Sequence, residues 1–306
     1  MRFAGVGSVA HMTSTHEIRD FLMSRRDKLQ PEDVGLPRGT RRRVPGLRRE
    51  EVATLAGVSI DYYVQVERGQ VNGVSDEVLS AIARALQLDD TERAHLFDLA
   101  RGSAGARRAR PTPARVPTAL QQLLDAIVDA PAVIQTGALD IVAANALGRA
   151  LYRPVFETQE APNLARYVYL DDDAARFYDD WDAIADDVAA MLRLELARAP
   201  GGATQRLVDE LVEKSAPFER RWNAHDVLDH RRGVKIVHDA EVGELRLRYE
   251  ALEVAGMPGT RLFGYTPDPD HPATRDGLHL LASLHATPRT DDDLTADAHP
   301  RGKAAR

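Results

Sequence analysis

Two short amphipathic segments, separated by one turn, constrain the fold of the N-terminal third of this 306-residue chain most strongly. The first, LRREEVATLAG, carries apolar residues at Leu47, Val52 and Leu55 and ends at Gly57, a residue type that often terminates helices. Ser59 then stands where it can cap the N-terminus of the second segment, IDYYVQVERG. The pattern predicts two helices joined by a three- or four-residue turn, which is the layout of a helix-turn-helix.

Amphipathic segments on both sides of this pair predict a compact all-α domain. In HEIRDFLMSRRDKL, Ile18, Phe21 and Leu22 share one helical face. Ser75 opens the segment SDEVLSAIARALQL, and the two acidic residues after it are favourable near a helix N-terminus. A further segment, DDTERAHLFDLAR, completes a set of five predicted helices.

The outward face of the second helix of the pair is a candidate for reading DNA, because this helix of a helix-turn-helix lies in the major groove. Gln65 could pair with adenine, Asp61 could accept from a cytosine amine, and Ile60 could contact a thymine methyl. Tyr62 is half outward and could contact a base or hydrogen-bond a phosphate. Tyr63 falls on the inward stripe, which predicts a core position.

Arginines cluster around the predicted turn and could neutralise DNA phosphates, with a strong dependence of binding on salt. On its own, the RRR run is equally typical of a solvated loop. Glu67 ends the second helix, and we expect it to bond an arginine or a helix N-terminus inside the fold. The predicted phosphate-contacting residues are Arg41, Arg42, Arg43, Arg48, Arg49, Ser59 and Arg68.

Charge is distributed unevenly along the chain, whose formal net charge is −7. Residues 1–116 carry 19 Lys and Arg against 15 Asp and Glu, whereas the remainder carries 21 against 32. A mildly basic front and an acidic rear indicate two different roles. The lack of cysteine excludes disulfides and thiolate metal sites, and no apolar run approaches the roughly 18 residues of a membrane helix. We expect a cytoplasmic protein without membrane contact.

Composition divides the chain into segments. Residues 1–12 are expected to be a flexible leader, and residues 13–101 form the predicted helix-turn-helix domain. Residues 102–117 are rich in Gly, Ala, Arg and Pro without apolar periodicity, which indicates a linker. Residues 118–286 form the second predicted domain, and the polar tail 287–306 is expected to be disordered.

The second domain has the mixed pattern of an α+β fold. AVIQ and LDIVAAN flank TGA, which indicates a β-hairpin. Three later segments, GVKIVHD, GELRLRYEALEV and TRLFGYTP, favour strands. In the middle one, Leu245, Leu247 and Tyr249 alternate with charged residues, as in an antiparallel sheet with one wet face. RFYDDWDAIADDVAAMLRLEL predicts a long amphipathic helix.

The string GLRREEVATLAGVSIDYYVQVERG resembles the λ-repressor-like (XRE-type) helix-turn-helix. Together with PEDVGLP, RRRVPGLRREEVA, LDIVAAN, PNLARYVYL, FERRWNAHDV and VGELRLRYEAL, it is similar to the MmyB-like transcriptional regulators over residues 15–285. The resemblance implies a multidomain chain, an all-α λ-repressor-like domain followed by a PAS-like α+β domain that binds a hydrophobic, fatty-acid-like molecule. It also implies a dimer. Ala144 stands where family members commonly have Trp, which implies a differently shaped pocket.

Aromatic residues concentrate in the second domain, and apolar cavities with a few polar anchors are the usual small-molecule sites. Arg221 and His225 follow Phe218 at spacings of three and seven, so they could share a helical face and anchor a carboxylate or other polar head. Alternatively, Trp181, Phe218 and Trp222 fill the core and His225 is satisfied within the fold. The candidate ligand-binding residues are Asn145, Tyr167, Trp181, Phe218, Arg221, Trp222, His225 and Tyr249.

Catalytic motifs are absent from the sequence, which has no GxSxG, HExxH or P-loop string. We therefore expect no catalytic residue, metal or cofactor. The predicted function is a dimeric transcriptional regulator that binds double-stranded DNA at a palindromic operator and responds to a hydrophobic small-molecule effector. Two alternatives stay open: the second domain only dimerises, or it is an enzyme that the helical domain tethers to DNA.

Overall fold

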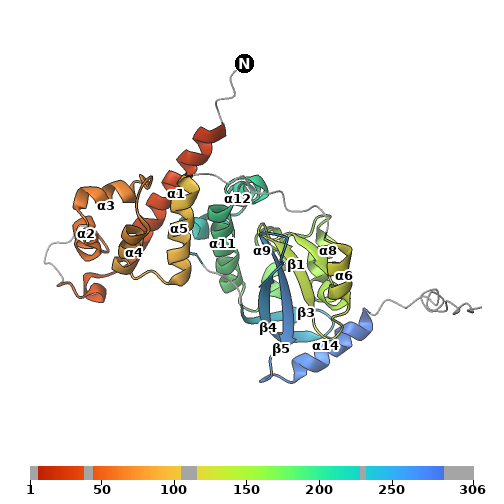
Figure 1. The fold of residues 1–306 in the computed structure, drawn as a ribbon. Helices are drawn as coiled ribbons and strands as arrows, with labels where there is room; N and C mark the ends of the chain where they lie inside the picture. Colours follow the sequence, from red (N-terminus) through yellow and green to blue (C-terminus); the bar gives the residue numbers. More distant parts are fainter. Residues whose placement is uncertain (1–5, 38–43, 105–115, 228–231, 286–306) are drawn as a thin grey trace, which may run out of the picture.

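The computed structural model describes residues 6–37, 44–104, 116–227 and 232–285. It shows a helical domain followed by a mixed domain built around a sheet (Figure 1). The elements of the helical domain are α1 (Val6–Lys28), η1 (Pro31–Val34), α2 (Arg49–Ala56), α3 (Ile60–Glu67), α4 (Asp76–Ala85) and α5 (Asp90–Ala104). The predicted multidomain fold, all-α followed by α+β, is confirmed.

The apolar stripes of the helices meet in one core. Ile18 and Phe21 of α1, Val52 of α2 and Tyr63 of α3 are all fully buried in it, as their spacing predicts. Leu55 does not follow the prediction, because it is 38% exposed on the outer side of α2.

The turn between α2 and α3 forms as the sequence predicts. Gly57 ends α2 with a φ of 68°, a left-handed conformation that glycine adopts without steric cost. The hydroxyl of Ser59 accepts a hydrogen bond from the backbone N–H of Tyr62 at 3.2 Å, which caps α3.

Two segment boundaries differ from the prediction. Helix α1 begins at Val6, so residues 6–12 are helical rather than a flexible leader; after Gly7 no Gly or Pro interrupts this helix. Helix α5 extends to Ala104, three residues into the predicted linker. Residues 105–115 and the predicted tail from 286 onward lie outside the described residues.

The mixed domain contains one antiparallel sheet with strand order β2-β1-β5-β4-β3, so β3 is an edge strand. The predicted hairpin is β1 with β2. Helix α14 was not predicted. The elements are α6 (Thr118–Asp125), β1 (Ala132–Thr136), β2 (Ile141–Ala144), α7 (Ala146–Leu151), α8 (Arg153–Thr158), α9 (Leu164–Leu170), α10 (Ala174–Phe177), α11 (Trp181–Arg198), α12 (Gly202–Lys214), α13 (Ala216–Asn223), β3 (Arg232–Asp239), β4 (Gly243–Glu253), β5 (Thr260–Pro267) and α14 (Ala273–Leu284).

The two faces of the sheet have different partners. Val133, Phe263 and Leu247 point to one face and belong to the main core of the domain, which the helices after β2 cover. Ile134 points to the other face and packs with Leu124 of α6 in a small separate cluster. The first of these faces, called the inner face below, therefore holds most of the buried volume of the domain.

Helix α11 joins the two domains in space. It packs against α5 of the helical domain and against α9, α12 and α13 of its own domain, and Figure 1 shows it between the two. Ala197, near its C-terminus, and Val227, which follows α13, belong to the apolar core of the helical domain. The domains therefore share an apolar interface.

Candidate functional site

Helix α3 presents the residues that were predicted to read DNA. Ile60 is 50% exposed, and Asp61 and Gln65 are exposed as well. Tyr62 is half-buried and packs against the core of the helical domain. Helices α2 and α3 lie at the end of the helical domain that is remote from the sheet (Figure 1). The mixed domain therefore does not cover this face of α3.

Glu67 fixes the opposite side of α3 from within the fold. Its side chain is 1% exposed, and its Oε1 accepts from Nε of Arg26 at 2.9 Å. Its other carboxylate oxygen bonds Nε of Arg49. Arg26 also donates to the carbonyl of Leu47 at 2.6 Å. The expectation that Glu67 bonds an arginine inside the fold is confirmed, and this buried bond ties α3 to α1 and α2.

The predicted phosphate-contacting arginines have different environments. Arg49 bonds Glu67 through its inner nitrogen, while its side chain is 49% exposed. Arg48 lies 3.3 Å from the exposed carboxylate of Glu50, which partly neutralises it. Arg68 is exposed directly after α3. Arg49 and Arg68 therefore place positive charge beside α3.

The other predicted phosphate-contacting residues are Ser59 and the three arginines at 41–43. The exposed hydroxyl of Ser59 already accepts the capping hydrogen bond of α3, and a hydroxyl can donate a second bond at the same time. Arg41, Arg42 and Arg43 lie outside the described residues.

Three predicted ligand-binding residues meet in an aromatic cluster between α9, α11 and α13. Phe218 is fully buried, stacks on Trp222 at 5.5 Å between ring centroids, and meets Tyr169 edge-on at 4.9 Å. Trp181 donates its indole N–H to the carbonyl of Val168 at 2.8 Å. This tight mutual packing matches the alternative in which these rings fill the core.

Arg221 and His225 do not share the helical face that their spacing suggested. Helix α13 ends at Asn223, and His225 follows with a φ of 56°, so helical spacing no longer applies to it. Arg221 forms ion pairs with two aspartates on α11, including Asp186 at 2.7 Å. His225 instead faces Arg193 at the junction with the helical domain, with 3.0 Å between Nδ1 and the guanidinium.

The side-chain amide of Asn145, a predicted ligand-binding residue, is bonded to backbone groups. Its Oδ1 accepts from the N–H of Ala132 at 3.0 Å and from that of Gly148 at 2.7 Å. Its Nδ2 donates to the carbonyls of Ile127 at 2.6 Å and Ala130 at 2.8 Å. Both donor protons and the amide oxygen are therefore occupied, so Asn145 caps α7 and fixes the start of β1.

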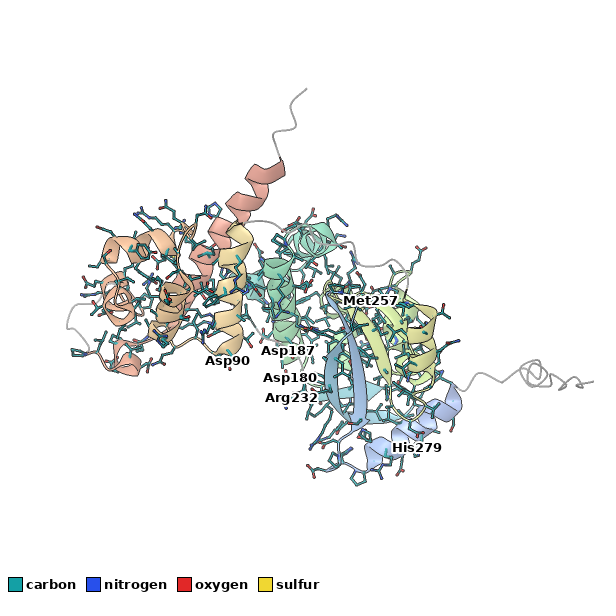
Figure 2. The ribbon with its side chains drawn as sticks, viewed as in Figure 1. Asp90, Asp180, Asp187, Arg232, Met257 and His279 are labelled. Atoms are coloured by element: carbon teal, nitrogen blue, oxygen red, sulfur yellow. The ribbon has the colours of Figure 1, made fainter. Side chains whose placement is uncertain are left out.

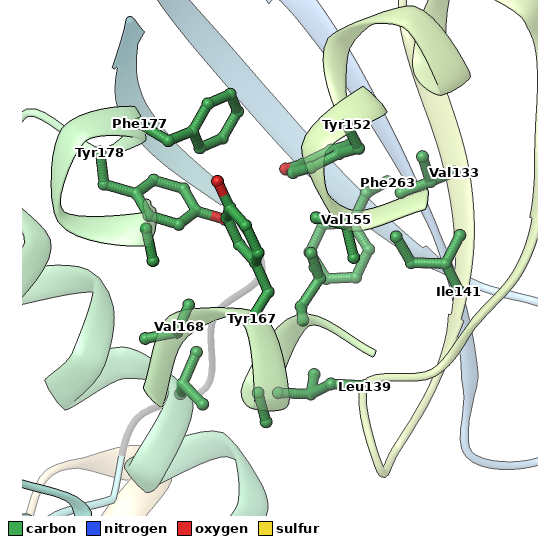
Figure 3. Close-up of a cluster of buried hydrophobic side chains, with 14 of the residues drawn as sticks. Val133, Leu139, Ile141, Tyr152, Val155, Tyr167, Val168, Phe177, Tyr178 and Phe263 are labelled. Atoms are coloured by element: carbon green, nitrogen blue, oxygen red, sulfur yellow. The ribbon is translucent and has the colours of Figure 1, made fainter. Parts of the chain in front are cut away.

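Tyr167 belongs to a second aromatic cluster, which lies on the inner face of the sheet. Figure 3 shows the rings of Tyr167 and Tyr178 close together, with Phe177 and Tyr152 near them. The hydroxyls of Tyr152 and Tyr265 lie 2.7 Å apart. The hydroxyl of Tyr167 is buried and has no hydrogen-bond partner among the described residues. Burial raises the pKa of Tyr167, so this hydroxyl stays protonated and can donate.

Lys235 is a cation at this cluster that the sequence analysis missed. It pairs in register with the buried Leu247 and thus points to the inner face. Its Nζ lies 5.5 Å from the ring centroid of Tyr178 and 5.7 Å from that of Tyr249. Burial lowers the pKa of Lys235 to about 8, opposed by the charge of Asp187 on α11. The sequence offered little signal for it, because Lys235 shares its face of GVKIVHD with Val237 and Asp239, while Val234 and Ile236 lie on the other face.

Within the described ranges, no helix is both long and apolar enough to cross a membrane. In the same part of the chain, no three His, Asp or Glu side chains are grouped so that they could hold a metal ion.

Comparisons with known families agree with these two structural units. A helix-turn-helix domain family matches residues 22–96, and the MmyB-like transcription regulator ligand binding domain family matches residues 116–281. A DNA-binding domain followed by a ligand-binding domain defines the class of ligand-responsive transcription regulators. Within this class, the chain belongs to the MmyB-like transcription regulators, as its resemblance predicted. A comparison with curated proteins gave no match.

Proposed function

We propose that this protein binds a specific DNA operator as a homodimer and that a hydrophobic small molecule in the mixed domain changes its affinity for that operator. The observation that carries the proposal is the two-sided environment of α3. Ile60, Asp61 and Gln65 are exposed on one side, while the buried Glu67 fixes the other side against α1 and α2. A helix held in this way can enter the major groove as a rigid unit.

The side chains on and beside α3 divide into two kinds of contact. Gln65 can form a bidentate pair with adenine, which specifies sequence. Arg49 and Arg68 can neutralise phosphates, which adds affinity for any duplex and makes binding salt-dependent. A dimer would place two such helices on two half-sites, and a palindromic operator follows from its twofold symmetry.

The regulatory part of the proposal needs only a difference in affinity. An effector that favours one arrangement of the two DNA-binding domains changes operator affinity, and DNA changes effector affinity by the same factor. Such coupling free energies are typically about 1–3 kcal/mol. Contact between α11 and α5 supports a mechanical link between effector and reading helix.

The base-reading role is tested by Gln65→Ala. Duplexes selected from random sequence by the wild-type protein provide the specific DNA, and a scrambled duplex provides the control DNA. We expect Gln65→Ala to weaken specific binding by about 1–3 kcal/mol per lost bidentate contact and to relax preference at one base pair. The matched control is Gln122→Ala on α6, which is exposed in the mixed domain. Equal losses on specific and scrambled DNA would remove the base-reading role.

The phosphate role is tested by Arg68→Ala, with Arg220→Ala on the exposed side of α13 as the control. We expect Arg68→Ala to weaken binding to both duplexes and to reduce the salt slope by about 1. Analytical ultracentrifugation of the protein with and without the selected duplex then tests the dimer. A monomer on a single half-site would contradict the proposed assembly while leaving DNA reading intact.

A further inference from the structure

A shallow groove of about 330 Å³ runs along an exposed face of α5, and every residue that lines it belongs to this helix. Helix α4 borders one side of α5 and α11 borders the other (Figure 1). On the first side, Arg93 donates to the hydroxyl of Ser80 at 3.2 Å. On the second side, Asp98 pairs with Arg198 at 3.5 Å. The groove is therefore an open strip between two packed helices.

Phe97 lies in the middle of this groove. It is half-buried, and the guanidinium groups of Arg93 and Arg101 lie 5.8 Å and 5.5 Å from its ring centroid. Ala94 is exposed and adds a small apolar side chain to the same face. Because aromatic residues and arginine are enriched in protein interfaces, the groove has the composition of a surface that contacts another protein.

The charges along the groove are balanced, since it contains two aspartates and two arginines. A uniformly acidic partner such as duplex DNA would therefore gain no attraction along its whole length. The two ends carry opposite charges, because Asp90 is in the first turn of α5 and Arg101 is in its last turn. Figure 2 shows Asp90 at the lower end of α5.

Both end charges can take a new partner. Asp90 is exposed and has no ion pair with a described residue. Arg101 lies 3.5 Å from Asp76 of α4, but both of these side chains are mostly exposed. Exposed ion pairs contribute little to stability, so Arg101 can exchange this carboxylate for another at little cost.

The order of residues in the groove is self-complementary. Asp90, Ala94, Phe97 and Arg101 follow one another at spacings of four, three and four, which places them on one stripe of the helix. The pair Asp90 and Arg101 has the same midpoint in the sequence as the pair Ala94 and Phe97. A second α5 in antiparallel orientation would therefore meet each acidic end with a basic end, and each large apolar side chain with a small one. Both contacts would occur twice, as in any isologous interface.

We propose that two copies of this chain meet along α5, in antiparallel orientation, when they occupy the two half-sites of one operator. Phe97 of each copy packs against Ala94 of the other, and Asp90 of each copy pairs with Arg101 of the other. This inference rests on the proposed homodimer and names a surface through which its two DNA-binding domains touch. The apolar area is small, so the contact is weak in free solution and forms through the high effective concentration on shared DNA.

This pairing is compatible with DNA reading and with regulation. Helix α3 packs on α1 and α2, and none of its residues lines the groove. Helix α11 packs against the side of α5 that carries Asp98. A shift of α11 would therefore change how the two copies of α5 meet, and through them the affinity for an operator with two half-sites.

Charge reversal in the full-length protein tests the contact. The quantity to measure is the ratio of two affinities, for a duplex with two selected half-sites and for a duplex with one, by fluorescence anisotropy. Asp90→Arg and Arg101→Asp should each lower this ratio by about tenfold, because two attractive pairs become repulsive. The double variant Asp90→Arg/Arg101→Asp should return the ratio to within about twofold of the wild type, because both pairs form again with their charges exchanged.

The matched controls lie on α4 of the same domain. Glu77 is in the first turn of α4 and Arg84 is in its last turn, as Asp90 and Arg101 are in α5. Neither control residue lines the groove. Glu77→Arg and Arg84→Asp change the charge of the domain and the ends of a helix in the same way, so they should leave the ratio unchanged.

Crosslinking tests the position of the contact directly, because the chain has no cysteine of its own. Ala94→Cys should be linked to its own copy by a short bis-maleimide at least about fivefold faster with the two-half-site duplex than with the single half-site. The control is Ala203→Cys, which is exposed on α12 and should show no such acceleration.

The outcomes separate this contact from the proposed homodimer. Charge reversals that leave the ratio unchanged, or a double variant that does not recover it, overturn the α5 contact and leave a dimer formed through another surface. Crosslinking of Ala94→Cys no faster than that of Ala203→Cys also overturns it, and is the result expected if the groove binds a different protein. Independent occupation of the two half-sites by the wild type contradicts both the contact and the homodimer.

Discussion

At the scale of single residues, His95 on α5 is a buried histidine whose ring nitrogens make no hydrogen bond to the described residues. It is 1% exposed and packs edge-on against Phe21 at 4.9 Å. Burial, together with the positive charges of Arg193 and Arg25, lowers the pKa of His95 to about 3. The folded protein therefore holds this histidine neutral.

His95 should make the protein sensitive to acid. The unfolded chain binds a proton at this residue near pH 6.5, whereas the folded chain does not until about pH 3. The free energy of unfolding therefore falls as pH is lowered through this window, by up to about 1.4 kcal/mol per pH unit. Urea unfolding measured at pH 6 and at pH 4.5 should show that the free energy of unfolding falls less between these pH values in His95→Leu than in the wild type.

His279→Leu is the matched control for this measurement, because His279 is exposed on α14. The free energy of unfolding of this variant should fall between pH 6 and pH 4.5 by as much as that of the wild type. Parallel pH dependence in all three proteins would contradict the assignment to His95.

At the scale of elements, the position of α3 depends on one buried carboxylate. Glu67 bonds Arg26 of α1 and Arg49 of α2, so its loss leaves the buried guanidinium of Arg26 without that counter-charge. Removal of one partner from a buried ion pair typically costs about 3–5 kcal/mol. We expect Glu67→Ala to lower the free energy of unfolding by about this amount and to abolish DNA binding.

Glu50→Ala is the control, because Glu50 lies on the same helix pair and its side chain is 56% exposed. Surface ion pairs contribute about 0–1 kcal/mol, so this variant should unfold almost as the wild type does. Urea unfolding followed by circular dichroism measures both. Equal stability of the Glu67→Ala variant and the wild type would show that packing alone positions α3.

The helix-turn-helix and the strands could be predicted because their signals are local. Gly57 and Ser59 mark the turn by their own backbone and side-chain chemistry. Strand β4 shows period-two alternation of Leu245, Leu247 and Tyr249 with charged residues, which indicates its inner face before any contact is known. The start of α1 at Val6 was not predicted, because residues 1–12 were expected to be a flexible leader.

The ligand-site residues could not be predicted as well, because their roles depend on partners distant in sequence. Arg221 and His225 were placed by extending α13 beyond Asn223, where the helix ends. The bonds of Asn145 go to backbone groups that only tertiary folding brings near. Lys235 escaped notice because a lysine in a strand is usually taken as solvent-facing.

At the scale of the whole molecule, a buried polar junction connects the two domains. Arg193 of α11 is 2% exposed, donates to Glu17 of α1 at 2.9 Å, and lies 4.0 Å from the ring centroid of Trp222. Arg25 of α1 donates to the carbonyl of His225 at 2.5 Å. Polar contacts of this kind fix orientation, and the apolar contacts of Ala197 and Val227 surround them.

Helix α11 therefore carries the junction and also packs into the main core of the mixed domain. A rigid helix transmits a small displacement at one end to the other, because packed interiors resist local compression. A displacement of α11 by a bound effector would thus shift the junction on which the helical domain rests.

If the junction makes the two domains unfold as one cooperative unit, removal of Arg193 should let them unfold independently. Differential scanning calorimetry of the wild type should give one transition, whereas Arg193→Met should give two, because Glu17 loses its buried partner. Arg206→Met on the exposed side of α12 is the control and should keep one transition. The variant's affinity for a single half-site should stay unchanged, since the bonds of Arg193 go to Glu17, His225 and Trp222 rather than to α3, while any effect of a bound effector on operator binding should disappear. A single, equally cooperative transition together with an undiminished effector response would mean that coupling does not pass through Arg193.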